Sequence, residues 1–261
     1  MKAHLRFLAI CVTTLLAACN SNDSPGSEPA RVLFLGNSVT YVGNLPAVFS
    51  ALCNASDRNC SAEMIVQGGA TLTDRVDDDS LERPTVEDRF DYLILQERGG
   101  DLMGAQIDRS ETQKHAESSA ATLVRTAREH GMEPVLLGTY QGSSSASRAL
   151  VTAETVLAKA LDAAYVPVSN YLDCGRLKNG ALRWLDRDGM HPGPELTLMM
   201  ATSLYRELFG SFPPAGEIVV RAPIYPVSSG LSAEGFASAQ PILPGTGASI
   251  TYDAATVSGC D

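Results

Sequence analysis

Short apolar runs and amphipathic stretches alternate along most of the chain. Runs of consecutive apolar residues that stop at glycine or polar residues predict buried strands. Stretches in which apolar residues recur every three or four positions predict the helices that cover those strands. The expected strands are residues 31–36, 61–69, 89–100, 133–140 and 165–172, and the expected helices are residues 45–56, 110–131, 147–164 and 193–210.

This alternation predicts the fold class. Strands that are nearly continuous in apolar residues are typical of a parallel sheet covered on both faces. We therefore expect a flavodoxin-like three-layer α/β/α sandwich with about five parallel strands. In such folds the site lies at the carboxyl ends of the strands, near the point where strand order reverses. Residues 31–210 form this domain, and residues 211–261, rich in Pro, Gly and Ser, are expected to be an extended tail packed on it.

The N-terminal segment lies outside this pattern. It has a basic start, followed by a short apolar run over residues 7–18. Cys19 comes directly after this run and completes a Leu-Ala-Ala-Cys motif. The run is too short to span a bilayer and looks like a bacterial lipoprotein signal, residues 1–18, with Cys19 lipidated. The alternative is an ordinary secretory signal cut near Ala18. Residues 19–30 are a polar, flexible tether. We expect a lipid-anchored protein of the bacterial cell envelope, periplasmic or on the outer surface, that meets the membrane through this lipid only.

The remaining cysteines agree with export. One of the six cysteines leaves with the signal, and four are left besides Cys19, in a compartment that permits disulfides. Cys53 and Cys60 are the natural local pair, and Cys174 and Cys260 would then tie the tail to the domain. Four cysteines allow three connectivities, and all three stay open. A metal site is not expected, because there is no C-x-x-C and no Cys/His cluster.

Net charge narrows the choice of partners. The chain carries a net charge of -10 and has no basic stripe that could neutralise phosphates. This balance argues against a nucleic-acid partner.

Polar residues suited to acyl transfer follow the predicted strands. A serine becomes a strong nucleophile when a base accepts its proton and an acid orients that base. The developing oxyanion needs N–H donors, which glycine turns and side-chain amides supply. The candidates are Ser38 after the first strand, Gly69 after the second, Gln96 and Arg98 after the third, and Asp188 and His191 after the fifth.

Four short motifs resemble those of the SGNH (GDSL-type) hydrolase and esterase superfamily, in the same order over residues 31–210. "LGNSVT" is similar to the nucleophile block, which implies that Ser38 is the nucleophile and that its N–H faces the oxyanion. "GGATL" is similar to the glycine block and implies Gly69 as a second N–H donor. "DGMHP" is similar to the last block and implies Asp188 and His191 as orienting acid and base.

The third block departs from the pattern of that superfamily. "LILQERGG" stands where Gly-x-Asn-Asp is usual. We expect Gln96 to replace the asparagine as side-chain donor, whereas a strict column-by-column comparison favours Arg98.

The resemblance implies a serine esterase that needs no cofactor and no metal. Its substrates are expected to be small-molecule or carbohydrate esters, acetyl esters of carbohydrates among them. Each residue alone has a plainer interpretation: Ser38 as a turn residue or helix cap, and His191 as a surface loop residue. The alternative function is a non-catalytic binding or structural lipoprotein on the same scaffold.

Overall fold

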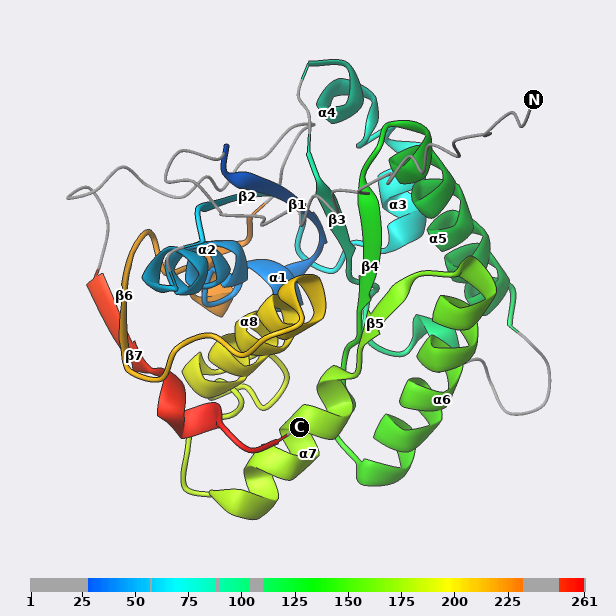
Figure 1. Cartoon of the computed structure of the whole chain (residues 1–261). Helices are drawn as coiled ribbons and strands as arrows, with labels where there is room; N and C mark the ends of the chain where they lie inside the picture. Colours follow the sequence, from blue (N-terminus) through cyan, green and yellow to red (C-terminus); the bar gives the residue numbers. More distant parts are fainter. Residues whose placement is uncertain (1–27, 57, 88–89, 104–109, 232–248, 261) are drawn as a thin grey trace, which may run out of the picture.

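A parallel five-stranded sheet forms the centre of the molecule (Figure 1). The computed structural model describes residues 28–56, 58–87, 90–103, 110–231 and 249–260. The expected signal and the lipidated Cys19 lie outside the described residues. The strands are β1 (Ala30–Gly36), β2 (Cys60–Val66), β3 (Tyr92–Leu95), β4 (Glu133–Leu137) and β5 (Ala164–Val166), in the spatial order β2-β1-β3-β4-β5. The predicted fold class is confirmed.

Helices cover both faces of this sheet, which explains why its strands are apolar throughout. Along β1, Val32 and Phe34 face one core, while Leu33 and Leu35 face the other. This alternation is the two-residue period of a strand. Helices α1, α2 and α8 lie on the first face and α3, α5 and α6 on the second (Figure 1).

The helices follow the predicted ones closely, with additions. They are α1 (Ser38–Tyr41), α2 (Leu45–Ala55), α3 (Leu72–Asp77), α4 (Glu82–Glu87), α5 (Glu111–Glu129), α6 (Ser144–Leu161), α7 (Val168–Lys178) and α8 (Pro194–Phe209). The short helices α1, α3 and α4 were not among the predicted elements. At α5 the Ser110 hydroxyl accepts from the Gln113 N–H, the N-terminal cap that its sequence predicts.

The predicted fifth strand is too long, and its second half is a helix. Of the predicted strand, only residues 165 and 166 pair with β4, as part of β5, and Pro167 then precedes α7. Val168, Tyr171 and Leu172 are buried at helical spacing on the face of α8. The same residues also fit a short apolar run, which is why periodicity alone did not separate strand from helix here.

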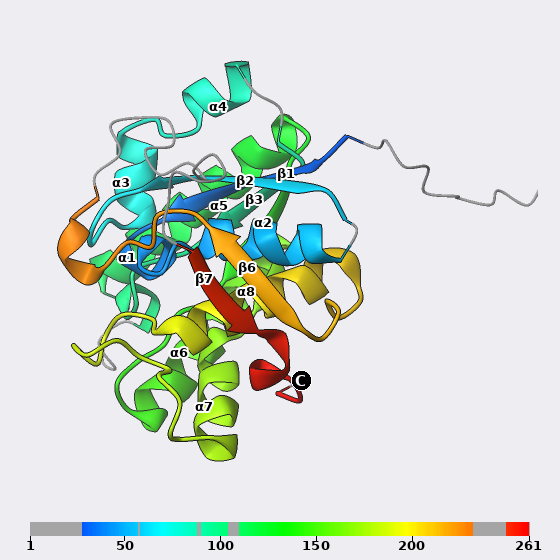
Figure 2. The same ribbon diagram turned by 90° about the vertical axis from the view of Figure 1, so that its left-hand side faces the viewer.

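The C-terminal segment packs across the domain rather than extending from it. β6 (Glu217–Arg221) and β7 (Ser249–Asp253) form an antiparallel pair that lies over α2 and α8 (Figure 2). Cys174 of α7 is bonded to Cys260, and Cys53 to Cys60, so the structure selects one of the three connectivities. Residues 222–231, which follow β6, lie beside the end of α1, where the Gly43 N–H donates to Tyr225 O. We call this segment the C-terminal strap.

Among the helices in the described ranges, none combines the length and the apolar character needed to cross a bilayer.

Candidate active site

Ser38 lies at the carboxyl end of β1, where the strand order reverses. Gly36 ends the strand, and Asn37 caps α1 by accepting the Val39 N–H at 3.0 Å. A Cβ atom at position 36 would lie 2.2 Å from the Thr40 hydroxyl oxygen, so the tight turn requires glycine there. Ser38 is the first residue of α1, and helix geometry leaves its N–H without an intrahelical partner.

Ser38, His191 and Asp188 meet in space across 153 positions of sequence. The Ser38 Oγ lies 2.9 Å from His191 Nε2, and His191 Nδ1 lies 2.5 Å from Asp188 Oδ2. The other carboxylate oxygen of Asp188 accepts the N–H groups of Met190 at 2.9 Å and His191 at 3.0 Å. Such a relay can take a proton from the hydroxyl and stabilise the imidazolium that forms.

Hydrogen bonds keep Asp188 ionised. Partial burial opposes the charge, but the Met190 N–H and the His191 ring and N–H outweigh it and lower the pKa of Asp188 to about 2. Its carboxylate is therefore charged throughout the neutral pH range.

A narrow loop carries both of these residues. The Gly193 N–H donates to Trp184 O, and the Asp186 N–H donates to His191 O, both at 2.9 Å. Gly189 has φ +70°, the sharp turn that its position predicts. A Cβ atom at Gly193 would lie 1.9 Å from the carbonyl oxygen of Arg183, so the base of the loop also requires glycine.

Tyr140, in the segment that follows β4, contacts this loop. Its side chain is buried, and its hydroxyl donates to Met190 O at 2.8 Å. Burial, with a smaller contribution from the Asp188 charge, raises the pKa of Tyr140 well above its ordinary value, so the hydroxyl keeps its proton. The sequence placed Tyr140 at the end of a predicted strand, residues 133–140, without showing what it would contact.

Gly69 lies in the turn after β2, with φ +71° and an exposed backbone. This φ favours glycine, although a Cβ atom would meet nothing within 4 Å. The turn is tied to the nucleophile's turn, because Asn37 Nδ2 donates to Ala70 O at 3.2 Å and to Gln96 O at 3.4 Å. Asn37 thus links the carboxyl ends of β1, β2 and β3.

Gln96, one of the two candidate oxyanion donors, bonds to α1 and to the segment after β4. Gln96 is buried, its Oε1 accepts the Thr40 hydroxyl at 2.7 Å, and its Nε2 donates to Gly138 O at 3.2 Å. The two ends of the amide therefore connect α1 to the residue that follows β4.

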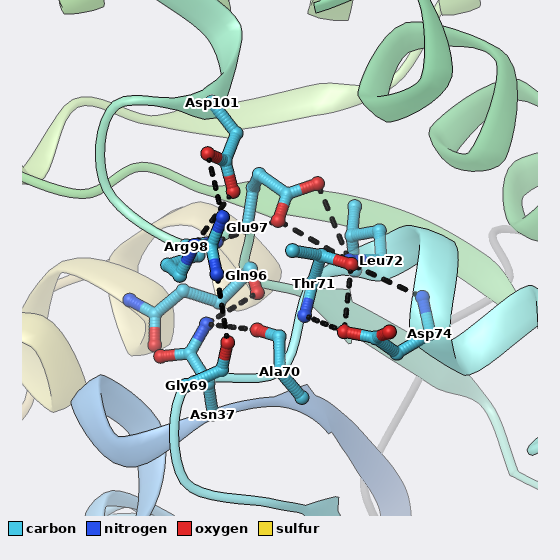
Figure 3. A network of polar contacts seen from close by, with 10 residues as sticks. All are labelled: Asn37, Gly69, Ala70, Thr71, Leu72, Asp74, Gln96, Glu97, Arg98 and Asp101. Atoms are coloured by element: carbon cyan, nitrogen blue, oxygen red, sulfur yellow. Dashed lines mark hydrogen bonds and ion pairs between the residues drawn. The ribbon is translucent and has the colours of Figure 1, made fainter. Parts of the chain in front are cut away.

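Arg98 lies on the exposed side of the same strand end (Figure 3). Its side chain pairs with Asp101 at 2.9 Å, and its Nη1 lies 3.4 Å from Gly69 O. Hydrogen bonding to Asp101 raises the pKa of Arg98 further, so it stays a cation. Of the two candidate side chains, Arg98 is the one with donors directed at the Gly69 turn.

Glu97, between them, is a buried carboxyl that the sequence motifs did not single out. It accepts the Leu72 N–H at 3.2 and 3.3 Å and the Arg98 N–H at 2.7 Å (Figure 3). Burial raises the pKa of Glu97 to about 7, against these two backbone donors. The available signal was an acidic residue two positions after the apolar run of β3.

Metal binding has no visible basis in the described part of the chain. None of its His, Cys, Asp and Glu residues form a group of three or more that could hold an ion.

Comparison with solved structures shows the same fold. TesA aligns with a TM-score of 0.53 at 15% identity, over 69% of this chain and 98% of that chain. A DUF4886 family protein from Bacteroides uniformis aligns with a TM-score of 0.56 at 14% identity, over 72% and 87%. The acetylxylan esterase Axe2 from Geobacillus stearothermophilus aligns with a TM-score of 0.51 at 16% identity, over 69% and 94%. No protein-family model and no curated protein sequence matches the chain.

Proposed function

We propose that this protein is a serine esterase of the SGNH type. The observation that carries the proposal is the linked Ser38–His191–Asp188 contact at the carboxyl end of β1. The shared fold supports it, since Axe2 is an acetylxylan esterase for which a serine-to-alanine and a histidine-to-alanine variant are described as catalytic mutants.

The reaction starts with attack of the Ser38 hydroxyl on the ester carbonyl, while His191 accepts the hydroxyl proton. His191 then gives this proton to the departing alcohol, and an acyl-enzyme remains. A water molecule then attacks the acyl group while His191 accepts its proton. His191 returns this proton to the Ser38 oxygen, so that the acid is released and Ser38 is restored. Asp188 holds the imidazole in the required tautomer throughout.

The tetrahedral intermediate carries an oxyanion that needs donors. The N–H groups of Ser38 and Gly69 are two of them, and the Arg98 guanidinium is the third in this proposal. One such donor is worth about 3–4 kcal/mol of the barrier. The resemblance and the acetylxylan esterase neighbour favour acetyl esters of carbohydrates as substrates.

Hydrolysis of short nitrophenyl esters tests the proposal. Wild-type protein should release nitrophenol faster from the acetyl ester than from longer acyl esters, and Ser38→Ala should lower kcat by about 10³-fold or more. A folded wild-type protein that binds these esters without hydrolysing them would instead support the non-catalytic binding protein.

We further propose that Cys19 is lipidated and holds the enzyme at the envelope surface. The Leu-Ala-Ala-Cys motif supports this, as do two disulfides in the folded domain. In a bacterial host that exports it, full-length protein should fractionate with membranes, and Cys19→Ser should release it to the soluble fraction. An unchanged distribution of the variant would contradict the anchor.

A further inference from the structure

The turn that carries Gly69 is fastened at each end by contacts from distant parts of the chain. On its N-terminal side, the Gly68 N–H donates to Leu231 O of the C-terminal strap at 3.0 Å. On its C-terminal side, the Leu72 N–H is held by both carboxylate oxygens of Glu97. The orientation of the Gly69 N–H depends on both contacts.

Glu97 is the stronger of these two fasteners. Its side chain is only 2% exposed, and a hydrogen bond in such surroundings is stronger than one in water. Leu72 is the first residue of α3, so Glu97 bonds to the start of that helix. The Thr71–Asp74 capping box at the same helix start, drawn in Figure 3, is exposed.

The same carboxylate also fixes the other side of the site. It accepts the Arg98 N–H at 2.7 Å, which sets the backbone from which the guanidinium reaches toward Gly69 O. One buried group thus spans two loops, the turn after β2 and the turn after β3. These loops supply two of the three oxyanion donors in the proposed reaction.

We propose that Glu97 is a positioning residue for ester hydrolysis, which holds the Gly69 N–H and Arg98 in register with Ser38. The inference rests on the proposed function. Glu97 itself does not touch the substrate, and its effect reaches the reaction through the two loops. Because oxyanion donors act on the transition state more than on the bound ester, loss of this register lowers kcat and leaves KM nearly unchanged.

The chain offers a matched control in Glu154. This carboxyl of α6 is 1% exposed and accepts the Thr139 N–H at 2.9 Å and the Tyr165 hydroxyl at 2.6 Å. Burial raises its pKa to about 7, as it does for Glu97. Like Glu97, Glu154 is a buried carboxyl that accepts a backbone N–H beyond the end of a sheet strand. Its partners follow β4 and do not belong to the Gly69 turn.

The test replaces each carboxylate by the isosteric amide, which presents an NH₂ group where an oxygen accepted. In Glu97→Gln we expect kcat to fall about tenfold, with KM within about twofold. Affinity for phenylboronic acid, whose serine adduct places an oxygen among the oxyanion donors, should fall by a similar factor. In Glu154→Gln the thermal stability should fall comparably, with kcat within about twofold of wild type.

Equal losses of kcat in the two variants would overturn the inference, as would an unchanged kcat in folded Glu97→Gln. If Glu97→Gln does not fold, Glu97→Asp gives the second measurement, because the shorter carboxylate cannot hold both N–H groups. It should lower kcat with little change in KM, and wild-type kcat would overturn the inference. An inactive wild-type protein would overturn the proposed function and with it this inference, whereas an active wild type with unaffected Glu97 variants overturns the inference alone.

Discussion

At the scale of single residues, the site depends on which polar atoms are already engaged inside the fold. The sequence predicts that Ser38, Asp188 and His191 lie together, because few residue types perform acyl transfer and the motifs place them after strands, and the structure shows the three in contact. Gln96 and Arg98 are both chemically able to donate, so the sequence left the third donor open. We propose Arg98, because the Gln96 amide already bonds to Gly138 O, 42 positions away.

Substitution of the two candidate donors separates their roles. Arg98→Ala should lower kcat by at least about tenfold, because an oxyanion donor is worth up to 10²–10³. Gln96→Ala should instead lower the unfolding free energy by about 2 kcal/mol, since the Thr40 hydroxyl and Gly138 O lose a buried partner. Steady-state kinetics and thermal melts of both variants measure this. A larger kcat loss in Gln96→Ala than in Arg98→Ala would restore Gln96 as the donor.

At the scale of elements, the long strands and helices could be predicted because their apolar periodicity is strong. The short helices could not: α1 has four residues, and its cap, Asn37, also fits an ordinary turn. The start of α7 was predicted as strand, because its buried Val168 and Leu172 continue an apolar run. The segment is helical because its buried residues pack against α8. This tertiary contact cannot be read from the sequence of the segment itself.

A prediction at this scale concerns the packing of α7 against the loop that carries Asp188 and His191. A Cβ atom at Gly175 of α7 would lie 2.3 Å from the ring of Trp184, at the base of the loop that carries Asp188 and His191. Gly175→Ala should therefore destabilise the fold by about 1–3 kcal/mol, although alanine normally favours a helix. Thermal unfolding measures the effect.

Gly142 provides the control for this substitution. A Cβ atom there meets nothing within 4 Å, so Gly142→Ala should change stability by less than about 0.5 kcal/mol. If the two variants have equal stabilities, the close contact between α7 and Trp184 is not what stabilises the loop.

At the scale of the whole molecule, the C-terminal segment packs against the side of the domain that carries the candidate active site. Its packing could be predicted from its composition and Cys260, but its path could not. The C-terminal strap contacts the site through backbone groups: Tyr225 O accepts the Gly43 N–H, and Leu231 O accepts the Gly68 N–H, both at 3.0 Å. Backbone contacts of this kind carry no sequence signature.

Two buried carboxyls make the stability of the molecule pH-dependent. The pKa of Glu97 and of Glu154 is raised from 4.5 to about 7, so the folded state binds more protons than the unfolded state between these values. Their stabilising contribution is present below pH 4.5 and is lost as the pH rises to 7, by at most about 3 kcal/mol for each. Asp188, with a pKa lowered to about 2, acts in the opposite direction and only at lower pH.

Denaturant unfolding between pH 5 and pH 7 tests this account. The unfolding free energy of wild-type protein should decrease over the interval, and the decrease should be smaller in Glu154→Gln, which has lost one of the titrating groups. A variant whose unfolding free energy has the same pH slope as wild type would show that Glu154 titrates outside this interval.

The most direct test of the central claim is covalent labelling with a fluorophosphonate. The reagent phosphonylates a serine only where a base and oxyanion donors activate it. We expect stoichiometric labelling of folded wild-type protein, with the added mass on the peptide that contains Ser38, no labelling of Ser38→Ala, and much slower labelling of His191→Ala. Folded wild-type protein that stays unlabelled while a known serine esterase reacts under the same conditions would contradict the assignment of Ser38 as nucleophile.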